Sequence, residues 1–155
     1  MSTIRPVRPD DTPRVHALIA RIFADYGYLF EVERENPHLA DPGSWFRRTG
    51  GEFWVVEHDG QVIGSCGVLL REDEAELRSL YVAPEHRRRG WGRRLTQMAI
   101  EHARAAGRPR IVLWTDVRFG EAHKLYESLG FVRSGRRSVA TTNRFCEHFY
   151  ELTLR

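Results

Sequence analysis

Leu77–Leu95, LRSLYVAPEHRRRGWGRRL, is the stretch that decides the fold of this chain. An apolar run with the pattern of a strand ends at Pro84, a basic loop follows, and Gly90 and Gly92 open an amphipathic helix. The free N–H groups and the positive dipole end of a first helical turn both favour a bound anion. The order strand, loop, helix N-terminus therefore predicts a phosphate site. Five arginines add positive charge around it: Arg87, Arg88, Arg89, Arg93 and Arg94.

The sequence on either side of this stretch predicts a mixed α/β domain. Helices are expected after Asp10 or Asp11, near 44–48, and over 90–106 and 120–129. An Asp-Gly turn at 59–60 joins two of the expected strands as a hairpin. Antiparallel hairpins then surround one β-α-β crossover. The expected strands are 4–7, 52–57, 61–70, 74–82, 110–115, 131–139 and 145–154.

The length of 155 residues predicts one domain, spanning 1–155. No apolar run approaches the roughly 20 residues that span a bilayer, and the N-terminus has no apolar signal core, so we expect a cytoplasmic protein without membrane contact. Cys66 and Cys146 have no CxxC partner and are expected to be packing residues in a reducing compartment. The formal net charge is only +3, and the clustering of charge matters more than its sum.

Other families of glycine-rich phosphate loops do not fit this sequence. The loop lacks the GxxxxGK[ST] pattern of Walker nucleotide sites. It also lacks the GxGxxG pattern of dinucleotide folds, because Arg94 and Leu95, and no third glycine, follow Gly90 and Gly92. The seven histidines show no HExxH or similar spacing, so no metal site is expected.

Arg-x-x-Gly-x-Gly at 87–92, preceded by Tyr-Val-Ala-Pro-Glu at 81–85, resembles motif A of the GNAT superfamily of N-acetyltransferases. In that family the motif holds the pyrophosphate of acetyl-coenzyme A (acetyl-CoA). The run from Ala122 to Phe131, with Leu125-Tyr126 and Gly130 at matching positions, resembles the second family motif. The resemblance implies a mixed, mostly antiparallel central sheet with a V-shaped split and flanking helices. It also implies acetyl-CoA as co-substrate and makes a homodimer one expectation.

The resemblance also implies which residues contact the cofactor. Backbone groups before the loop would pair with the pantetheine arm and the thioester carbonyl, and the loop itself would hold the phosphates. Many family members carry asparagine where this chain has Phe119, so one contact is missing or is replaced, with Asp116 as a candidate. The expected cofactor-binding residues are Leu80, Tyr81, Val82, Arg87, Arg88, Arg89, Gly90, Trp91, Gly92 and Arg93.

Acyl transfer needs a proton donor for the leaving thiolate and a proton acceptor for the amine. Tyr126 is the candidate acid, because a phenol with a pKa of about 10 is protonated at neutral pH; the alternative is that it only packs in the core. Glu76 is the candidate base, acting through water, and the alternative is a solvated residue on the outer face. His123, His148 and Glu147 are weaker candidates. Cys66 is not expected to act as a nucleophile, because no base is paired with it in the sequence.

The acceptor is expected against Phe23–Glu35, which mixes aromatic side chains with carboxylates. Tyr26, Tyr28 and Phe30 are the candidate substrate-binding residues, since aromatic faces and carboxylates together suit a cationic amine. We expect direct transfer to a primary amine of a small molecule or amino-acid-like acceptor. A peptide, protein or aminoacyl-tRNA amine, or a non-catalytic acyl-CoA-sensing module, are the alternatives. Nucleic acid is not an expected partner, because the phosphates of coenzyme A account for the arginines.

Overall fold

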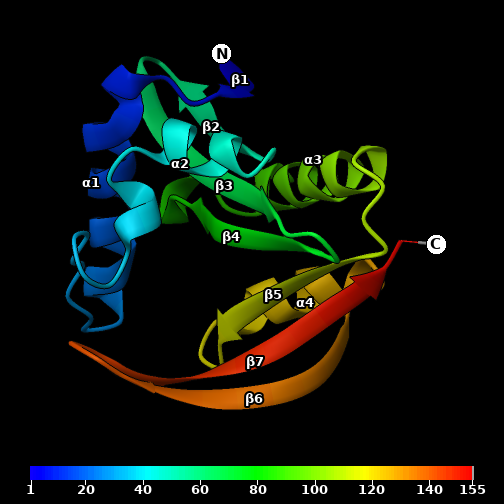
Figure 1. Ribbon diagram of the computed structural model, residues 1–155. Coiled ribbons are helices and arrows are strands. Elements are labelled where there is room, and N and C mark those ends of the chain that lie inside the picture. The colour runs from blue at the N-terminus through cyan, green and yellow to red at the C-terminus, as the bar shows by residue number, and fades with distance from the viewer. Residues whose placement is uncertain (155) are drawn as a thin grey trace.

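The computed structural model describes residues 1–154 and contains one seven-stranded sheet (Figure 1). The strand order is β1-β2-β3-β4-β5-β7-β6, and β4 and β5 form the one parallel pair among the described residues. Parallel neighbours need a crossover, and helix α3 supplies it. The strands are β1 (Ser2–Pro6), β2 (Glu52–His58), β3 (Gln61–Leu70), β4 (Ala75–Val82), β5 (Arg110–Asp116), β6 (Val132–Ala140) and β7 (Arg144–Thr153).

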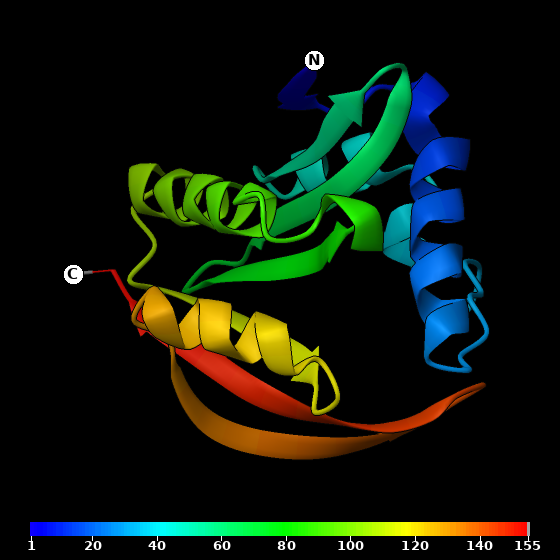
Figure 2. The same cartoon turned by 180° about the vertical axis from the view of Figure 1, so that it is seen from behind.

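Helices cover both faces of the sheet. α1 (Thr12–Asp25) and α2 (Pro42–Arg48) lie on one face, and α3 (Trp91–Ala105) and α4 (Gly120–Ser128) lie on the other (Figures 1 and 2). Each long helix presents one apolar stripe to the sheet, as amphipathic helices do. Short 3-10 turns occur at Pro9–Asp11, Pro37–Leu39 and Pro84–His86. The buried stripe of α1 is Val15, Leu18, Ile19 and Ile22, and that of α3 includes Leu95, Ala99 and Ala103.

The expected fold class and the expected order of elements are confirmed. Boundaries differ by one or two residues at most ends. The short helix near 44–48 begins earlier, at Pro42, because the Asp41 side chain accepts a hydrogen bond from the Ser44 amide at 3.3 Å. Aspartate is a favourable N-cap, and proline is favourable at the first helical position.

The structure bears on the expectations about membrane contact and about the cysteines. Among residues 1–154, no helix is both long and apolar enough to cross a bilayer. Both cysteines are free thiols. Cys66 is fully buried in β3, as expected of a packing residue. Cys146 is half-buried in β7, where a hydrogen bond from Arg136 lowers the pKa of its thiol.

Candidate active site

β4 and β5 separate after only two paired positions. Ala75 pairs with Ile111 and Glu76 with Val112, and the two strands then diverge. β4 also carries a bulge, since Ser79 and Leu80 together lie opposite Cys66 of β3. Ser79 has a φ of 58°, a left-handed conformation that is uncommon outside glycine. The sheet therefore opens into a V, and within residues 1–154 the edge of β4 that faces β5 has no strand partner beyond Glu76.

A first cavity of about 400 Å³ lies at the open end of this split, beside the basic loop. Nine of the ten residues expected to bind the cofactor line it, and Arg89 does not. Arg89 instead approaches the His86 ring, at 3.3 Å. The cavity is also lined by residues of α1 and α4, so it reaches across the split. These additional residues are Ile22, Tyr26, His86, Arg118, Phe119, Gly120, Glu121, Ala122 and Leu125.

The backbone of the loop has the form that an anion site needs. Gly90 has a φ of 84° and is the N-cap of α3, and the first intrahelical hydrogen bond runs from the Arg94 amide to the Gly90 carbonyl. The amides before Arg94 therefore have no intrahelical acceptor and point out of the helix end. Gly92 lies close to α4, where an added Cβ would stand 3.3 Å from the Leu125 side chain. Arg88 and Arg93 reach across to α4, to Glu121 and Ser128 respectively.

A second cavity, of about 170 Å³, continues from the first. The two share Leu80, Tyr81, Phe119 and Ala122, so they meet at the bulge of β4 and the start of α4. The second cavity lies between β4 on one side and β5 and β7 on the other. Its other lining residues are Phe23, Tyr28, Asn36, Leu77, Arg78, Ser79, Trp114, Thr115, Asp116, Tyr126, Phe145 and Glu147.

Tyr126 lies on the buried face of α4 and lines the second cavity. Its side chain is 4% exposed and packs edge-on against Phe131, with Tyr150 also adjacent. Burial raises the pKa of the Tyr126 phenol well above its usual value of about 10. The phenol therefore stays protonated at any ordinary pH and can donate a proton or a hydrogen bond into the cavity.

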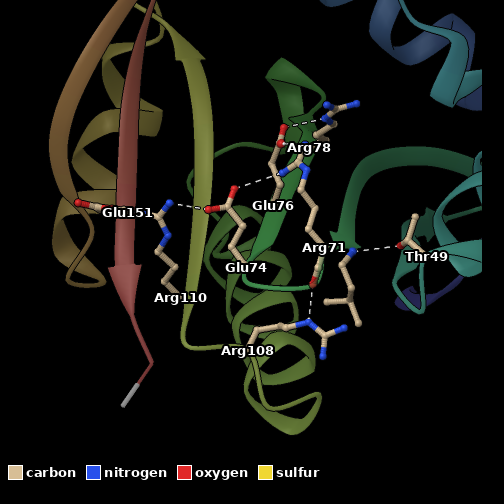
Figure 3. A network of polar contacts seen from close by, with 9 residues as sticks. Thr49, Arg71, Glu74, Glu76, Arg78, Arg108, Arg110 and Glu151 are labelled. Carbon is tan, nitrogen blue, oxygen red and sulfur yellow. Dashed lines mark hydrogen bonds and ion pairs between the residues drawn. The ribbon is translucent and has the colours of Figure 1, made fainter.

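Glu76 does not lie where the sequence led us to expect it. It is buried at the closed end of the split, outside the lining of both cavities. Arg71 Nη2 and Arg78 Nε each donate to its carboxylate, at 2.6 and 2.7 Å (Figure 3). This position is a correction to the expected placement of Glu76 in the cleft, because two guanidinium groups occupy its carboxylate. Its role as a base stays a prediction.

The carboxylates that line the second cavity are Asp116 and Glu147. They are directly paired across β5 and β7, where like charges repel. Asp116 accepts hydrogen bonds from the Tyr28 hydroxyl at 2.7 Å and the Arg118 amide at 2.8 Å. Glu147 accepts from Arg137 Nε at 2.7 Å. These donors offset the repulsion and hold two acidic groups together at the cavity wall.

The three expected acceptor residues occupy different places. Tyr26 lines the first cavity and Tyr28 the second. Phe30 lines neither, because its ring packs against Phe23 at 5.5 Å and His16 at 5.8 Å. The role of Phe30 in binding the acceptor stays a prediction.

The cavity residues that the sequence reasoning missed include Arg78, Trp114 and Phe145. Strand alternation could have found the last two, because Trp114 shares a strand face with Asp116 and Phe145 shares one with Glu147. The other candidate bases, His123 and His148, lie 5.3 Å apart by ring centroids and line neither cavity. Among residues 1–154 there is no cluster of three or more potential metal ligands.

The chain is similar to known proteins both in sequence and in fold. Residues 15–131 match the acetyltransferase (GNAT) family. The N-acetyltransferase YjgM of Escherichia coli (strain K12) is 32% identical over 144 residues, which cover 84% of this chain and 86% of that protein. The N-acetylaspartate synthetase of Danio rerio is 39% identical over 100 residues, covering 63% of this chain and 36% of that protein, so the match spans about a third of its length.

Solved structures share the fold at lower identity. The protein YncA of Salmonella typhimurium, solved with its cofactor acetyl-CoA, superposes with a TM-score of 0.78 at 22% identity. The superposition covers 99% of this chain and 94% of that one.

Proposed function

Because the chain belongs to the GNAT family of acetyltransferases, we propose that it moves an acetyl group from acetyl-CoA directly to the primary amine of a small, amino-acid-like acceptor. One observation carries this proposal. The loop before α3, whose free amides suit an anion, lines the first cavity. The β4 bulge lies where that cavity meets the second one, which Tyr126 lines. The acetyl-CoA bound to YncA supports the donor, and the name of the zebrafish relative supports an amino-acid-like acceptor.

The first cavity suits the donor. The free amides of the loop and of the first turn of α3, with Arg87, Arg88 and Arg93, would hold the phosphates. Beyond Glu76 the β5-facing edge of β4 needs hydrogen-bond partners, and the amide groups of a pantetheine arm supply them. We assign Leu80, Tyr81 and Val82 to that arm, with Gly90, Trp91 and Gly92 at the phosphates. Arg89 is left out, because it lies outside the cavity.

Acetyl-CoA brings a thioester, and the residues around it supply proton transfer and charge stabilisation. A bond forms between the acceptor nitrogen and the acetyl carbon, and the carbon–sulfur bond breaks. The protonated amine first loses one proton to a base. As the nitrogen attacks it loses a second proton, and the departing thiolate takes one from the Tyr126 hydroxyl, which the second proton restores. The backbone amides at the bulge stabilise the negative charge that develops on the carbonyl oxygen.

We assign proton acceptance to the carboxylate pair Asp116 and Glu147, directly or through a water. Both line the cavity that would hold the acceptor, whereas Glu76 lies outside it. Two carboxylates also attract the protonated amine into the cavity before it is deprotonated.

The test is an amine panel scored for acetyl-CoA-dependent thiol release. It contains free amino acids, simple amines, a peptide, a protein and an aminoacyl-tRNA. Thiol release with the small amines supports the proposal. Release with only the protein or the aminoacyl-tRNA would contradict the proposed acceptor class. No release from any amine, together with tight acetyl-CoA binding, would indicate a sensor.

A further inference from the structure

Charged side chains of opposite sign lie on the two walls of the second cavity. Arg78, next to the bulge residue Ser79, belongs to the β4 wall. Asp116 and Glu147 belong to the opposite wall, formed by β5 and β7. A cavity that is cationic on one side and anionic on the other is complementary to a ligand that carries both charges.

Arg78 retains hydrogen-bonding capacity that the protein does not use. Its Nε donates to Glu76 at 2.7 Å, and no hydrogen bond or ion pair within residues 1–154 uses its Nη1 or Nη2. The guanidinium lies 5.6 Å from the centre of the Trp45 ring, which supports the plane of the group. The Arg78 side chain is 32% exposed. Two preoriented N–H donors at a cavity wall match the geometry of a carboxylate.

Arg78 is also the end of its ion-pair chain (Figure 3). Glu76 is shared with Arg71, and Arg71 also pairs with Glu74 at 3.4 Å. Arg71 is not part of the cavity lining. Of the two arginines that hold Glu76, only Arg78 can therefore contact a ligand in the second cavity.

We propose that the acceptor is a free amino acid and that Arg78 binds its carboxylate. This inference rests on the acetyltransferase function proposed above. The amino group of that acceptor then faces the opposite wall, where Asp116 and Glu147 lie. A cavity of about 170 Å³ is suited to a small ligand. A peptide or protein acceptor has a neutral amide in place of the carboxylate, so it would leave the Arg78 guanidinium without its anion.

The experiment compares matched pairs of substrates on the purified full chain. Several L-amino acids are each paired with their amino acid amide, which keeps the amine and side chain and removes the carboxylate charge. Thiol release from acetyl-CoA gives kcat and KM for each. The variants are Arg78→Gln and the control Arg71→Gln. Both remove one partner of Glu76 and one positive charge, and their melting temperatures show whether each is folded.

Wild-type protein is expected to prefer the acid to the amide by about tenfold or more, because a charge-assisted pair is lost with the amide. Arg78→Gln should remove this preference, mainly by raising KM for the acids, and leave the amides within about threefold. Arg71→Gln should keep the preference. Equal use of acids and amides by wild type, or an equal loss on both in Arg78→Gln, would overturn the inference alone. No release from any amine would overturn the proposed function as well.

Discussion

At the scale of single residues, burial raises the pKa of the Tyr126 phenol. A buried phenol is costly to ionise, so it keeps its proton in the resting protein. A thiolate leaving acetyl-CoA is a weaker base than the phenolate, so Tyr126 stabilises it by donating a hydrogen bond and gives up its proton only as another proton replaces it. The environment of Tyr126 thus favours donation to a transient anion over ionisation at rest.

Tyr126→Phe should lower kcat by about a hundredfold, the usual contribution of a general acid, and leave the Kd for acetyl-CoA nearly unchanged. The reason is that only the hydroxyl is removed, while the ring still packs on Phe131. Steady-state thiol release and calorimetric binding measure the two quantities. Tyr150→Phe is the control, since the Tyr150 hydroxyl bonds to Glu127 and lines neither cavity. An unchanged kcat in Tyr126→Phe would remove the acid role.

His38 links pH to stability. Burial lowers the pKa of its imidazole from 6.5 to about 4, with the charge of Arg78 as a further cause. The unfolded chain therefore binds a proton more readily than the folded one between about pH 6.5 and 4. Stability attributable to a neutral His38 is complete above pH 6.5 and is lost as the pH falls toward 4.

His38→Gln should accordingly flatten the acid side of the stability profile. The wild-type free energy of unfolding is expected to fall by about 3 kcal/mol more than that of the variant between pH 7 and pH 4, because folding lowers the pKa of His38 from 6.5 to about 4. Urea unfolding at a series of pH values gives the free energy of unfolding of each protein as a function of pH. Subtracting one curve from the other removes the contribution of the carboxylates that both proteins share. Parallel curves would show that His38 does not contribute.

At the scale of elements, the loop before α3 depends on a backbone conformation more than on side-chain contacts. Gly90 has open space around it, so a Cβ there meets no atom within 4 Å, yet its φ of 84° disfavours any L-residue. A substitution should therefore act by shifting the loop backbone away from the form that presents its amides.

Gly90→Ala should cost about 1 kcal/mol of stability and raise the Kd for acetyl-CoA. Gly60→Ala is a matched control, because Gly60 has a φ of 77° and equally open surroundings in the β2–β3 turn. It should lose similar stability and bind acetyl-CoA normally. The measurements are urea unfolding and calorimetric titration with acetyl-CoA. Weakened binding in both variants to the same degree would indicate a general loss of stability only.

A network of ion pairs holds the closed end of the split together. Arg110 of β5 bonds to Glu74 next to β4 at 2.6 Å and to Glu151 of β7 at 2.5 Å (Figure 3). Arg71 joins Glu74 to Glu76. The network therefore connects β4, β5 and β7 at the point where β4 and β5 have only two paired positions. Glu76 thus contributes to the hinge of the V, which accounts for its burial.

Glu76→Gln should lower the free energy of unfolding by about 1–3 kcal/mol, since a buried charged partner is lost, and change kcat less than about threefold. Glu74→Gln, in the same network, is the control for stability. Chemical unfolding and saturated thiol release are the readouts. A hundredfold fall in kcat in Glu76→Gln alone, with loss of the acidic limb of the pH–rate profile, would instead establish Glu76 as the base.

Local patterns predicted the elements and the strand–loop–helix arrangement around 77–95 well, because helix caps, strand alternation and the glycine spacing at 90 and 92 act over a few residues. The cavity walls depend on longer-range geometry. Nothing near Arg78 in the sequence indicates that a bulge follows it or that the Glu76 carboxylate forms an ion pair with Arg71. The packing of Phe30 on Phe23 could not be predicted for the same reason, since it depends on how the chain folds back after α1.

At the scale of the whole molecule, the split divides the sheet into β1–β4 and β5–β7, which meet through the short β4–β5 pairing and the network around Arg110. The core nevertheless runs through both parts, from Phe53 on β2 to Tyr150 on β7. We propose that residues 1–155 form one domain. The first cavity contains residues of α1, α3, β4 and α4, so a ligand there contacts both sides of the split.

The chain should therefore unfold in one cooperative transition, and acetyl-CoA should stabilise both sides equally. At a free concentration of one hundred times Kd, the free energy of unfolding should rise by about 2.7 kcal/mol. Urea unfolding followed by circular dichroism gives the total, and amide hydrogen exchange gives the protection of β2 and β7 separately. Equal gains in the two strands follow if the ligand bridges the split. Protection confined to β2 would mean that β5–β7 opens independently, and that the V is held by its hinge alone.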